Sequence, residues 1–168
     1  MADDFIKKAH VEKVDALFST IAMRYDLVND IQSAGLHRLW KRKMARLVAL
    51  GESEQALDVC CGTGDLIFRL AKRGGRVAGV DMNGAMLNVA RRRLAKCNIG
   101  QSRLYQADAL QLPFGDGQFD VVTIAYGLRN LADYKTGLQE IFRVLKPGGR
   151  LAILDFGKPP NRFVRGLY

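Results

Sequence analysis

The chain has 168 residues, 48% of them apolar and 26% charged, which is the composition of a globular protein and not of a disordered chain. This length is enough for one domain with its own hydrophobic core, so the fold does not require disulfide bonds. Lys and Arg number 26 against 17 Asp and Glu, and the net charge of +9 leaves nucleic acid, an anionic membrane surface and an acidic small ligand open as partners.

The cysteines and the apolar runs indicate the compartment. Cys60 and Cys61 are adjacent and Cys97 stands alone, without C-x-x-C or other metal-ligand spacing, which predicts no metal site and a reduced environment. No apolar run approaches the roughly 18 residues of a membrane span, and the N-terminus shows no signal-type apolar stretch. These features predict a cytoplasmic protein that is not exported.

Two helical patterns occupy the first fifty residues. Apolar residues recur at helical spacing from Val11 to Ile21 and again from Leu36 to Leu50. Between them, residues 25–35 collect Asp, Asn, Ser and Gly, which predicts a turn or a helix cap. Residues 38–46 and 91–96 carry clusters of Lys and Arg; solvated helix faces are the plain interpretation, and a binding surface is the alternative. We expect residues 1–52 to form a helical N-terminal segment.

From residue 55 onward, short β-rich runs alternate with helical patterns of about a dozen residues, which is typical of parallel βαβ units. The expected strands are Ala56–Val59, Arg76–Val80, Ser102–Gln106, Phe119–Ile124 and Arg150–Leu154. The expected helices are Asp65–Lys72, Ala85–Cys97 and Tyr134–Leu145, and the segment KPGG at 146–149 is expected to turn the chain into the last strand. Residues 53–168 are therefore predicted as an α/β doubly wound domain, in which ligands bind beyond the carboxyl ends of the strands.

A glycine turn follows the first expected strand. In the segment LDVCCGTGD, Asp58 lies near the strand end, and Gly62 and Gly64 permit positive φ and a close approach of a ligand to the backbone. A dinucleotide fingerprint would require a third glycine at position 67, where this chain has Ile67. The turn therefore favours a nucleoside ligand over a pyrophosphate.

Two further acidic residues follow the second and third expected strands. Asp81 can accept hydrogen bonds from both hydroxyl groups of a ribose, and Asp108 can accept from an adenine amino group while Ala109 lines the ring. Each Asp has an alternative role as a helix cap or turn residue, because Asp is favoured there. Together with the glycine turn, the acidic residues describe a slot for a nucleoside.

The segments LDVCCGTGD, GVDMN, QADA and LKPGGRLAILDF, in this order, resemble the motifs of class I S-adenosylmethionine-dependent methyltransferases. Two more specific segments, YDLVNDIQSAGLHRLW at 25–40 and TIAYGLRNLAD at 123–133, resemble the ubiquinone/menaquinone biosynthesis C-methyltransferases of the UbiE or MenG type. The similarity extends from about Phe18 to Leu167. It implies a Rossmann-like fold with a mostly parallel sheet and helices on both faces, and S-adenosylmethionine as the cofactor.

The resemblance also implies which residues contact the cofactor. Thr63 and the glycine loop would contact its methionine part, Asp81 its ribose, and Asp108 with Ala109 its adenine. The full implied set is Asp58, Gly62, Thr63, Gly64, Asp81, Met82, Asp108, Ala109 and Ala125. Family members often carry a small hydroxyl residue where this chain has Ala125, so a cofactor hydrogen bond from that side chain is not expected here.

The implied reaction transfers the sulfonium methyl group to a ring carbon of a polyprenylated quinol, either demethylmenaquinol or 2-methoxy-6-polyprenyl-benzoquinol. Arg129 and Asn130 follow the fourth expected strand, where they could orient the quinol oxygen or stabilise a developing phenolate. Tyr126 could stack on the ring or share a hydrogen bond. The alternative for Arg129 is that of a cation that anchors a loop.

His37 has two interpretations. Its ordinary pKa near neutrality suits a general base. Its place one helical turn before Trp40 instead favours a polar clamp that closes the N-terminal segment over the cofactor, together with Tyr25 and Asp26. The choice of base stays open, and ring deprotonation through water is one route.

Two alternative functions remain open from the sequence. A nucleic-acid methyltransferase would use the positive charge, but the fourth strand ends in IAYG instead of a D/N-P-P-Y motif, and no Pro-Cys nucleophile is present. A binding module without turnover is the other, because similar methyltransferases continue beyond Tyr168 with strands that complete the sheet; we expect a shortened chain. A peripheral attachment to an anionic membrane, where quinol precursors lie, and a homodimer also remain open.

Overall fold

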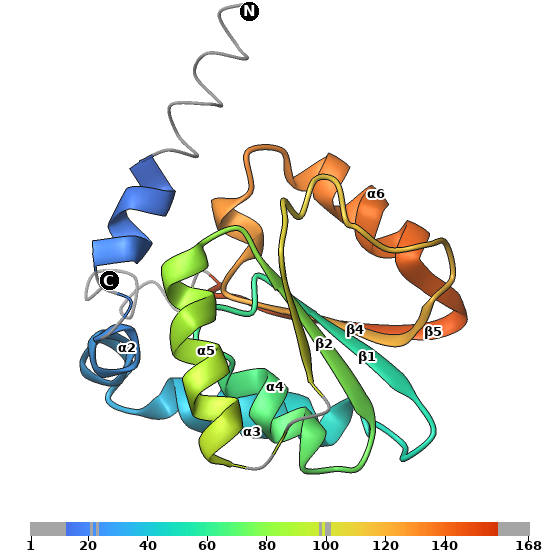
Figure 1. Ribbon diagram of the computed structural model, residues 1–168, viewed down its shortest axis with the longest axis horizontal. Helices are drawn as coiled ribbons and strands as arrows, with labels where there is room; N and C mark the ends of the chain where they lie inside the picture. The colour runs from blue at the N-terminus through green and yellow to red at the C-terminus, as the bar shows by residue number, and fades with distance from the viewer. Residues whose placement is uncertain (1–12, 21, 23, 98, 100–101, 158–168) are drawn as a thin grey trace, which may run out of the picture.

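The computed structural model describes residues 13–20, 22, 24–97, 99 and 102–157. Residues 13–20 are helical, and two helices follow, α2 (Tyr25–Ser33) and α3 (Leu36–Leu47). Figure 1 shows these segments on the outside of an α/β body in which a twisted sheet is covered by helices on both faces.

The sheet has five parallel strands in the order β3-β2-β1-β4-β5. The strands are β1 (Gln55–Val59), β2 (Arg76–Asp81), β3 (Arg103–Gln106), β4 (Phe119–Ala125) and β5 (Leu145–Leu154). The chain reverses direction across the sheet between β1 and β4, so the carboxyl end of β1 is the switch point where ligands bind in doubly wound folds.

Helices cover both faces of this sheet (Figure 1). They are α4 (Asp65–Ala71), α5 (Gly84–Lys96), the 3₁₀ turn η1 (Leu128–Asn130) and α6 (Tyr134–Val144). Helices α3, α4 and α5 share one buried cluster with Ala56 and Val121, whereas α6 shares the other with Leu57 and Val122. Successive strand residues thus enter opposite cores, as the two-residue period of a strand requires.

The strands and helices expected from residue 55 onward agree with the structure to within one or two residues, with one difference at β5. β5 begins at Leu145 and pairs with Phe119 there, and the pairing resumes only at Arg150 with Val121. Residues 146–149 therefore bulge out of the ladder, with Gly148 at φ +76°, where the sequence predicted a turn.

The break predicted over residues 25–35, with a turn or a helix cap, is too long, because α2 occupies Tyr25–Ser33. The break is confined to Ala34 and Gly35, which have φ values of +48° and +76°. Asp side chains disfavour helix interiors when they bond to nearby backbone groups. Here Asp26 and Asp30 bond instead to side chains of other helices, so they do not compete with the helix.

No helix in the described part of the chain is both long enough and apolar enough to cross a membrane.

Candidate functional site

A cavity of about 80 Å³ lies at the carboxyl ends of the strands. The three places that the sequence singled out as a nucleoside slot all line it, namely Gly62, Asp81 and Asp108. Its other lining residues from the predicted set are Met82, Ala109, Ala125, Tyr126 and Asn130. The predicted slot is therefore one continuous site in the fold.

The strand order determines how this site is arranged. Asp108 follows β3, Asp81 ends β2, Gly62 follows β1 and Ala125 ends β4, and these strands are neighbours in that order. An elongated ligand that begins at Asp108 and runs along the sheet edge consequently meets Asp81 next and reaches the turn after β1 last.

Asp81 is held by backbone groups. Its Oδ2 accepts a hydrogen bond from the Gly62 N–H at 2.8 Å, and its Oδ1 accepts from the Asn83 N–H at 2.9 Å. Burial raises the pKa of Asp81, and these two backbone donors partly offset the rise. The alternative of Asp81 as a helix cap is wrong, because the N-cap of α5 is Asn83, whose side chain accepts from the Met86 N–H.

Asp108 performs a turn role and lines the cavity at the same time. Its Oδ1 accepts from the Leu110 N–H at 2.9 Å, as Asp does in tight turns. The adjacent Ala109 is buried and forms part of the cavity wall. The turn therefore holds the Asp108 carboxylate at the cavity wall.

The two glycines of the turn have different environments. Gly62 has φ +53° and lines the cavity, and a Cβ there would lie 3.4 Å from the Cε of Met86, another lining residue. Gly64 has φ +77° and does not line it; a Cβ at this position would lie 3.1 Å from the Cβ of Ala90 in α5. Gly64 thus permits close packing of the turn against α5.

Asp58 and Thr63 do not line the large cavity but a smaller one of about 20 Å³ beside it. Asp58 is on the α3 face of β1, and its Oδ1 accepts from the Thr123 hydroxyl at 2.7 Å across the pair Asp58–Thr123. Burial raises the pKa of Asp58 to about 7, although the Thr123 hydrogen bond and the charge of Lys41 oppose the rise. The sequence signal for this orientation is that successive side chains of β1 point to opposite faces of the sheet.

The residues that the sequence predicts on the substrate side lie around an aromatic stack. Tyr126 has φ +61°, which is strained for a non-glycine residue, and its ring stacks on Phe156 with centroids 4.8 Å apart. Its buried hydroxyl has no hydrogen-bond partner among the described residues, and burial raises its pKa to about 12. Asn130 lines the cavity and donates to the Tyr126 carbonyl at 3.2 Å.

Arg129 lies beside this stack and not in the cavity lining. Its guanidinium carbon is 5.7 Å from the Tyr126 ring centroid and 5.2 Å from that of Phe156, and it pairs with Asp155. The anchoring that the sequence left as an alternative is present, and the planar cation is also held over both rings.

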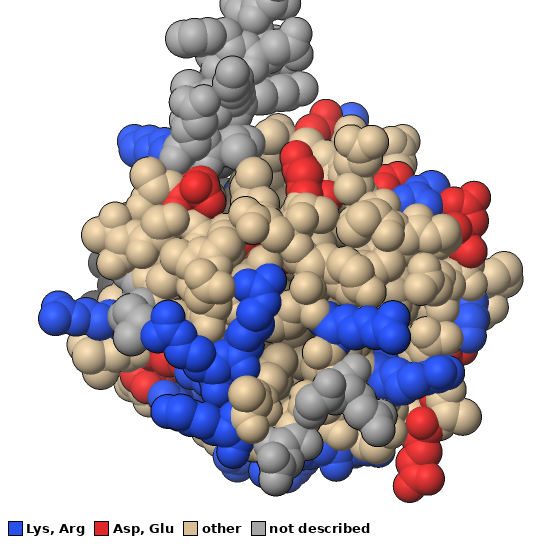
Figure 2. Space-filling view, in the orientation of Figure 1, with Lys and Arg blue, Asp and Glu red and all other residues tan. Residues whose placement is uncertain are grey.

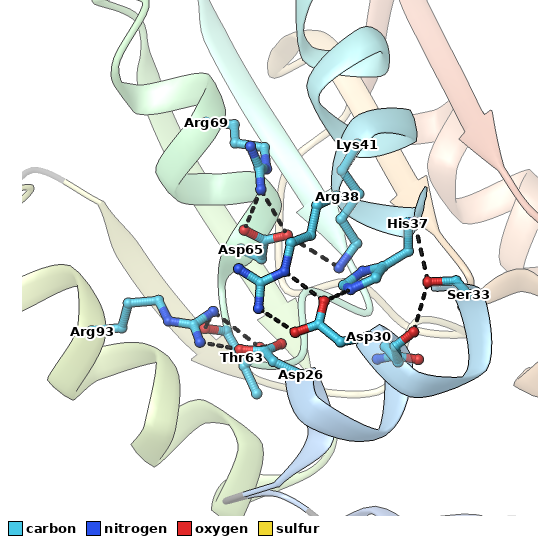
Figure 3. A network of polar contacts seen from close by, with 11 residues as sticks. Asp26, Asp30, Ser33, His37, Arg38, Lys41, Thr63, Asp65, Arg69 and Arg93 are labelled. Atoms are coloured by element: carbon cyan, nitrogen blue, oxygen red, sulfur yellow. Dashed lines mark hydrogen bonds and ion pairs between the residues drawn. The ribbon is translucent and has the colours of Figure 1, made fainter. Parts of the chain in front are cut away.

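Helices α2, α3, α4 and α5 meet in a network of charged side chains near the glycine turn (Figure 3). Asp26 of α2 pairs with Arg93 of α5 and accepts from the Thr63 hydroxyl at 3.0 Å. Lys41 of α3 and Arg69 of α4 both approach Asp65, at 3.5 and 3.1 Å. Although burial opposes ionisation, these two cations hold the pKa of Asp65 below its ordinary value.

His37 belongs to the outer part of this network. It is buried, its ring Nε2 is 2.8 Å from Asp30 Oδ1, and its backbone N–H donates to the Ser33 hydroxyl at 3.2 Å. Asp30 also accepts from Arg38, and the hydrogen bonds from Arg38 and His37 lower its pKa to about 2. His37 lines neither cavity and ties α2 to α3.

The N-terminal helical residues form one wall of the large cavity, with Val14, Asp15 and Phe18. Asn83 attaches this wall to the sheet, because its Nδ2 donates to Asp15 Oδ1 at 2.8 Å and to the Ser19 hydroxyl at 2.7 Å. Sequence analysis missed Lys41, Asp65, Asn83 and Arg93. These polar residues lie in ordinary helical or turn patterns, and only the packing of separate elements brings them to the site.

Comparisons with known proteins agree with this geometry. The model of the ubiE/COQ5 methyltransferase family matches residues 6–168. The ubiquinone/menaquinone biosynthesis C-methyltransferase UbiE of Azotobacter vinelandii is 46% identical over 160 residues, which are 93% of this chain and 63% of that protein. The chain thus spans somewhat less than two thirds of the curated relative.

Solved structures show the same fold. A SAM-dependent methyltransferase from Aquifex aeolicus is 26% identical with a TM-score of 0.66, over 73% of this chain and 66% of that one. The YcgJ protein of Bacillus subtilis is 26% identical with a TM-score of 0.67, over 72% and 52%. Together with the match along nearly the whole chain, these likenesses show that the chain belongs to the ubiE/COQ5 methyltransferase family.

Proposed function

We propose that this chain is the catalytic part of an S-adenosylmethionine-dependent C-methyltransferase that acts on a polyprenylated quinol. The observation that carries the proposal is the meeting of Gly62, Asp81 and Asp108 in one cavity, in the spatial order of a nucleoside. Membership of the ubiE/COQ5 family and the named relative support the quinol as acceptor.

The residues present fit the cofactor. Asp81 is a half-buried carboxylate that lines the cavity, Gly62 leaves the space that a Cβ would fill, and Ala109 supplies an apolar wall for an aromatic base. When bound, S-adenosylmethionine supplies an electrophilic methyl group on a sulfonium. The protein's contribution is to orient donor and acceptor and to exclude water from the cavity.

The substrate side is built for an aromatic acceptor. We propose that Tyr126 contacts the quinol ring, that Asn130 helps to position it, and that Arg129 stabilises negative charge on the phenolic oxygen. Tyr126 lines the cavity and its buried hydroxyl has no hydrogen-bond partner among the described residues, which supports its role. The position of Arg129 over two aromatic rings supports the role proposed for Arg129.

Isothermal titration with S-adenosylmethionine, followed by transfer assays, tests this function. We expect saturable binding to one site and methyl transfer to demethylmenaquinol, to the methoxy-benzoquinol precursor or to both. Binding without transfer to either acceptor would favour the binding module, and absence of binding would overturn the proposal. Transfer to a single acceptor would define the substrate class.

We also propose that the protein is cytoplasmic and attaches peripherally to an anionic membrane. Figure 2 shows most Lys and Arg side chains on the half of this face where Figure 1 places α3, α4 and α5. A groove between α3 and α4 is lined by Arg42, Arg46, Arg69, Lys72 and Arg73. Clustered cations of this kind attract acidic lipid headgroups.

Liposome flotation tests the attachment. We expect the wild type to float with vesicles that contain anionic lipid and not with neutral vesicles. The variant Arg42→Gln/Arg46→Gln should lose flotation, whereas the matched variant Arg91→Gln/Arg92→Gln on α5 should retain most of it. Equal flotation with neutral vesicles would contradict the proposal.

A further inference from the structure

Helix α2 is amphipathic, but its polar side faces the protein and its apolar side faces solvent. Asp26, Asp30 and Ser33 are directed toward α3, α5 and the glycine turn, where both carboxylates form ion pairs (Figure 3). Leu27 and Ile31 lie one helical turn apart on the outward side and are 57% and 74% exposed. A surface helix of a globular protein normally buries its apolar side, so the orientation of α2 is the reverse of the usual one.

Exposed apolar residues continue into the first turns of α3. A two-residue turn joins the helices, and α3 then exposes Leu36 and Leu39, whereas His37 between them is buried. We call the exposed Leu27, Ile31, Leu36 and Leu39 the α2–α3 apolar surface. Large apolar side chains that gather at the surface of a protein mark a place where another protein or a membrane is bound.

The charges on α2 and α3 indicate the kind of partner. Residues 24–47, all of which the structure describes, contain two acidic side chains, Asp26 and Asp30, and both are held in ion pairs. The exposed cations of the same segment are Arg24, Arg38, Arg42, Lys43 and Arg46. The outer side of these helices therefore combines apolar side chains with positive charge and offers no unpaired carboxylate.

This combination fits an anionic bilayer better than a second copy of the chain. Two copies that met through this surface would place their cations against one another, which is unfavourable. At a bilayer, cations attract the anionic headgroups while apolar side chains enter the boundary between headgroups and acyl chains. The opposite charge of the headgroups and the exposed apolar residues thus act together only in the membrane.

Helix α2 also connects this surface with the candidate site. Tyr25, in the first turn of α2, lines both the large and the small cavity. A bilayer in contact with the outward side of α2 is consequently separated from the cavities by this one helix. The prenyl tail of a quinol lies in the bilayer, so its ring would have only a short distance to travel.

We propose that the outward side of α2 inserts into an anionic bilayer, with Leu27 and Ile31 at the boundary between headgroups and acyl chains. The inference rests on the membrane attachment proposed above and names the element that enters the bilayer. The cations on α3 and α4 supply the attraction to the surface, and α2 supplies the apolar contact. Because the strength of interfacial binding depends on both contributions, loss of either one weakens it.

Tryptophan fluorescence tests the insertion directly. Trp40 is the single tryptophan of the chain, and Trp40→Phe removes it. In this background, the tryptophan of Ile31→Trp should show a blue-shifted emission with vesicles of phosphatidylglycerol and phosphatidylcholine, and quenching by brominated acyl chains. Phe142→Trp is the matched control, because Phe142 is 61% exposed on α6, on the opposite side of the molecule from α2 (Figure 1). Its emission should stay unchanged; equal shifts at both positions, or none in a vesicle-bound Ile31→Trp, would overturn the proposal.

Flotation of serine variants measures the contribution of α2 to binding. Leu27→Ser/Ile31→Ser should lower the partition onto the same anionic vesicles at least about 10-fold, because two apolar side chains no longer leave water. Phe142→Ser should partition as the wild type does. Both variants alter exposed side chains, so we expect them to fold, and unfolding in urea checks this.

The remaining outcomes separate this inference from the attachment itself. If the wild type does not float with anionic vesicles, the attachment proposed above fails, and the insertion with it. If the wild type and Leu27→Ser/Ile31→Ser float equally, the attachment stands and only the insertion is overturned. A wild type that sediments as a dimer without vesicles, together with a monomeric Leu27→Ser/Ile31→Ser, would make the surface an interface between copies and would also overturn the proposal.

Discussion

The two ends of the candidate site are built in different ways. At the end that we propose for the nucleoside (the nucleoside end), Asp81 is held by the backbone N–H groups of Gly62 and Asn83, and Asp108 by that of Leu110. At the other end, Lys41, Asp65 and Arg93 come from three separate helices and are held by ion pairs between side chains.

This difference has a physical consequence. Backbone donors are fixed by the strands and turns that carry them, so the nucleoside end is rigid as soon as the sheet forms. Ion pairs between helices depend on helix packing and respond to salt and pH. We therefore expect ligand binding at the nucleoside end to weaken when a single hydrogen-bonding atom is removed. The ion pairs at the charged end should instead weaken gradually as salt or pH changes.

The largest expected effect is the loss of stability when Asp58 ionises. Burial raises its pKa from 3.8 to about 7, so between these pH values the folded state binds more protons than the unfolded chain. The free energy of unfolding therefore falls as pH rises through this range, by roughly 4 kcal/mol at about 1.4 kcal/mol per pH unit. Asp58→Asn should remove this fall, as urea unfolding at pH 4.5 and 8 would measure.

The readout is the difference between variant and wild type. Groups whose folded pKa is lowered, such as Asp30, change stability in the opposite direction, but they are common to both proteins and cancel. Parallel pH curves for the two proteins would show that Asp58 is not protonated in the folded state.

At the nucleoside end, Asp81→Asn should weaken S-adenosylmethionine binding by about 10- to 100-fold. An amide has one acceptor oxygen where the carboxylate has two, and the loss corresponds to about 1.5–3 kcal/mol for a charge-assisted hydrogen bond. Titration calorimetry measures the change. Asp116→Asn is the control, because Asp116 is exposed and distant from the cavity lining; equal effects of both substitutions would reject the ribose role of Asp81.

Substitutions of the two turn glycines distinguish a residue that contacts the ligand from one that only packs against α5. Gly62→Ala and Gly64→Ala should each lower the free energy of unfolding by about 1–2 kcal/mol, because both residues have positive φ. Gly148→Ala isolates the backbone strain, since it has φ +76° and no atom within 4 Å of its Cβ position. Only Gly62→Ala should also weaken cofactor binding; an equal loss in Gly64→Ala would contradict the assignment.

The smallest effect is expected at the charged end. Asp26 and Arg93 are partly exposed, so their ion pair should contribute only about 0.5–1 kcal/mol to stability. A double-mutant cycle with Asp26→Asn and Arg93→Gln should show this coupling at low salt and much less of it at about 0.5 M salt. Additive single substitutions at low salt would show that α2 is held by other contacts.

Local patterns were sufficient to predict most of the sheet and the residues that meet beyond the carboxyl ends of β1, β2 and β3. Glycine turns and acidic residues at strand ends need only the strand itself to place them, and parallel strands bring their carboxyl ends to one edge. That is why Gly62, Asp81 and Asp108 could be identified from the residues alone and are found in one cavity.

Tertiary contacts determine the features that the sequence did not predict, namely α2 and the charged residues at the site. The helix over Tyr25–Ser33 was missed because its Asp side chains look like turn formers until their partners on α3 and α5 are known. Lys41 likewise resembles its exposed neighbours on a basic helix, and only its burial against the glycine turn distinguishes it. A side chain's charge can be read from the chain, but its partner cannot, because ion pairs form between elements that only the packed fold brings together.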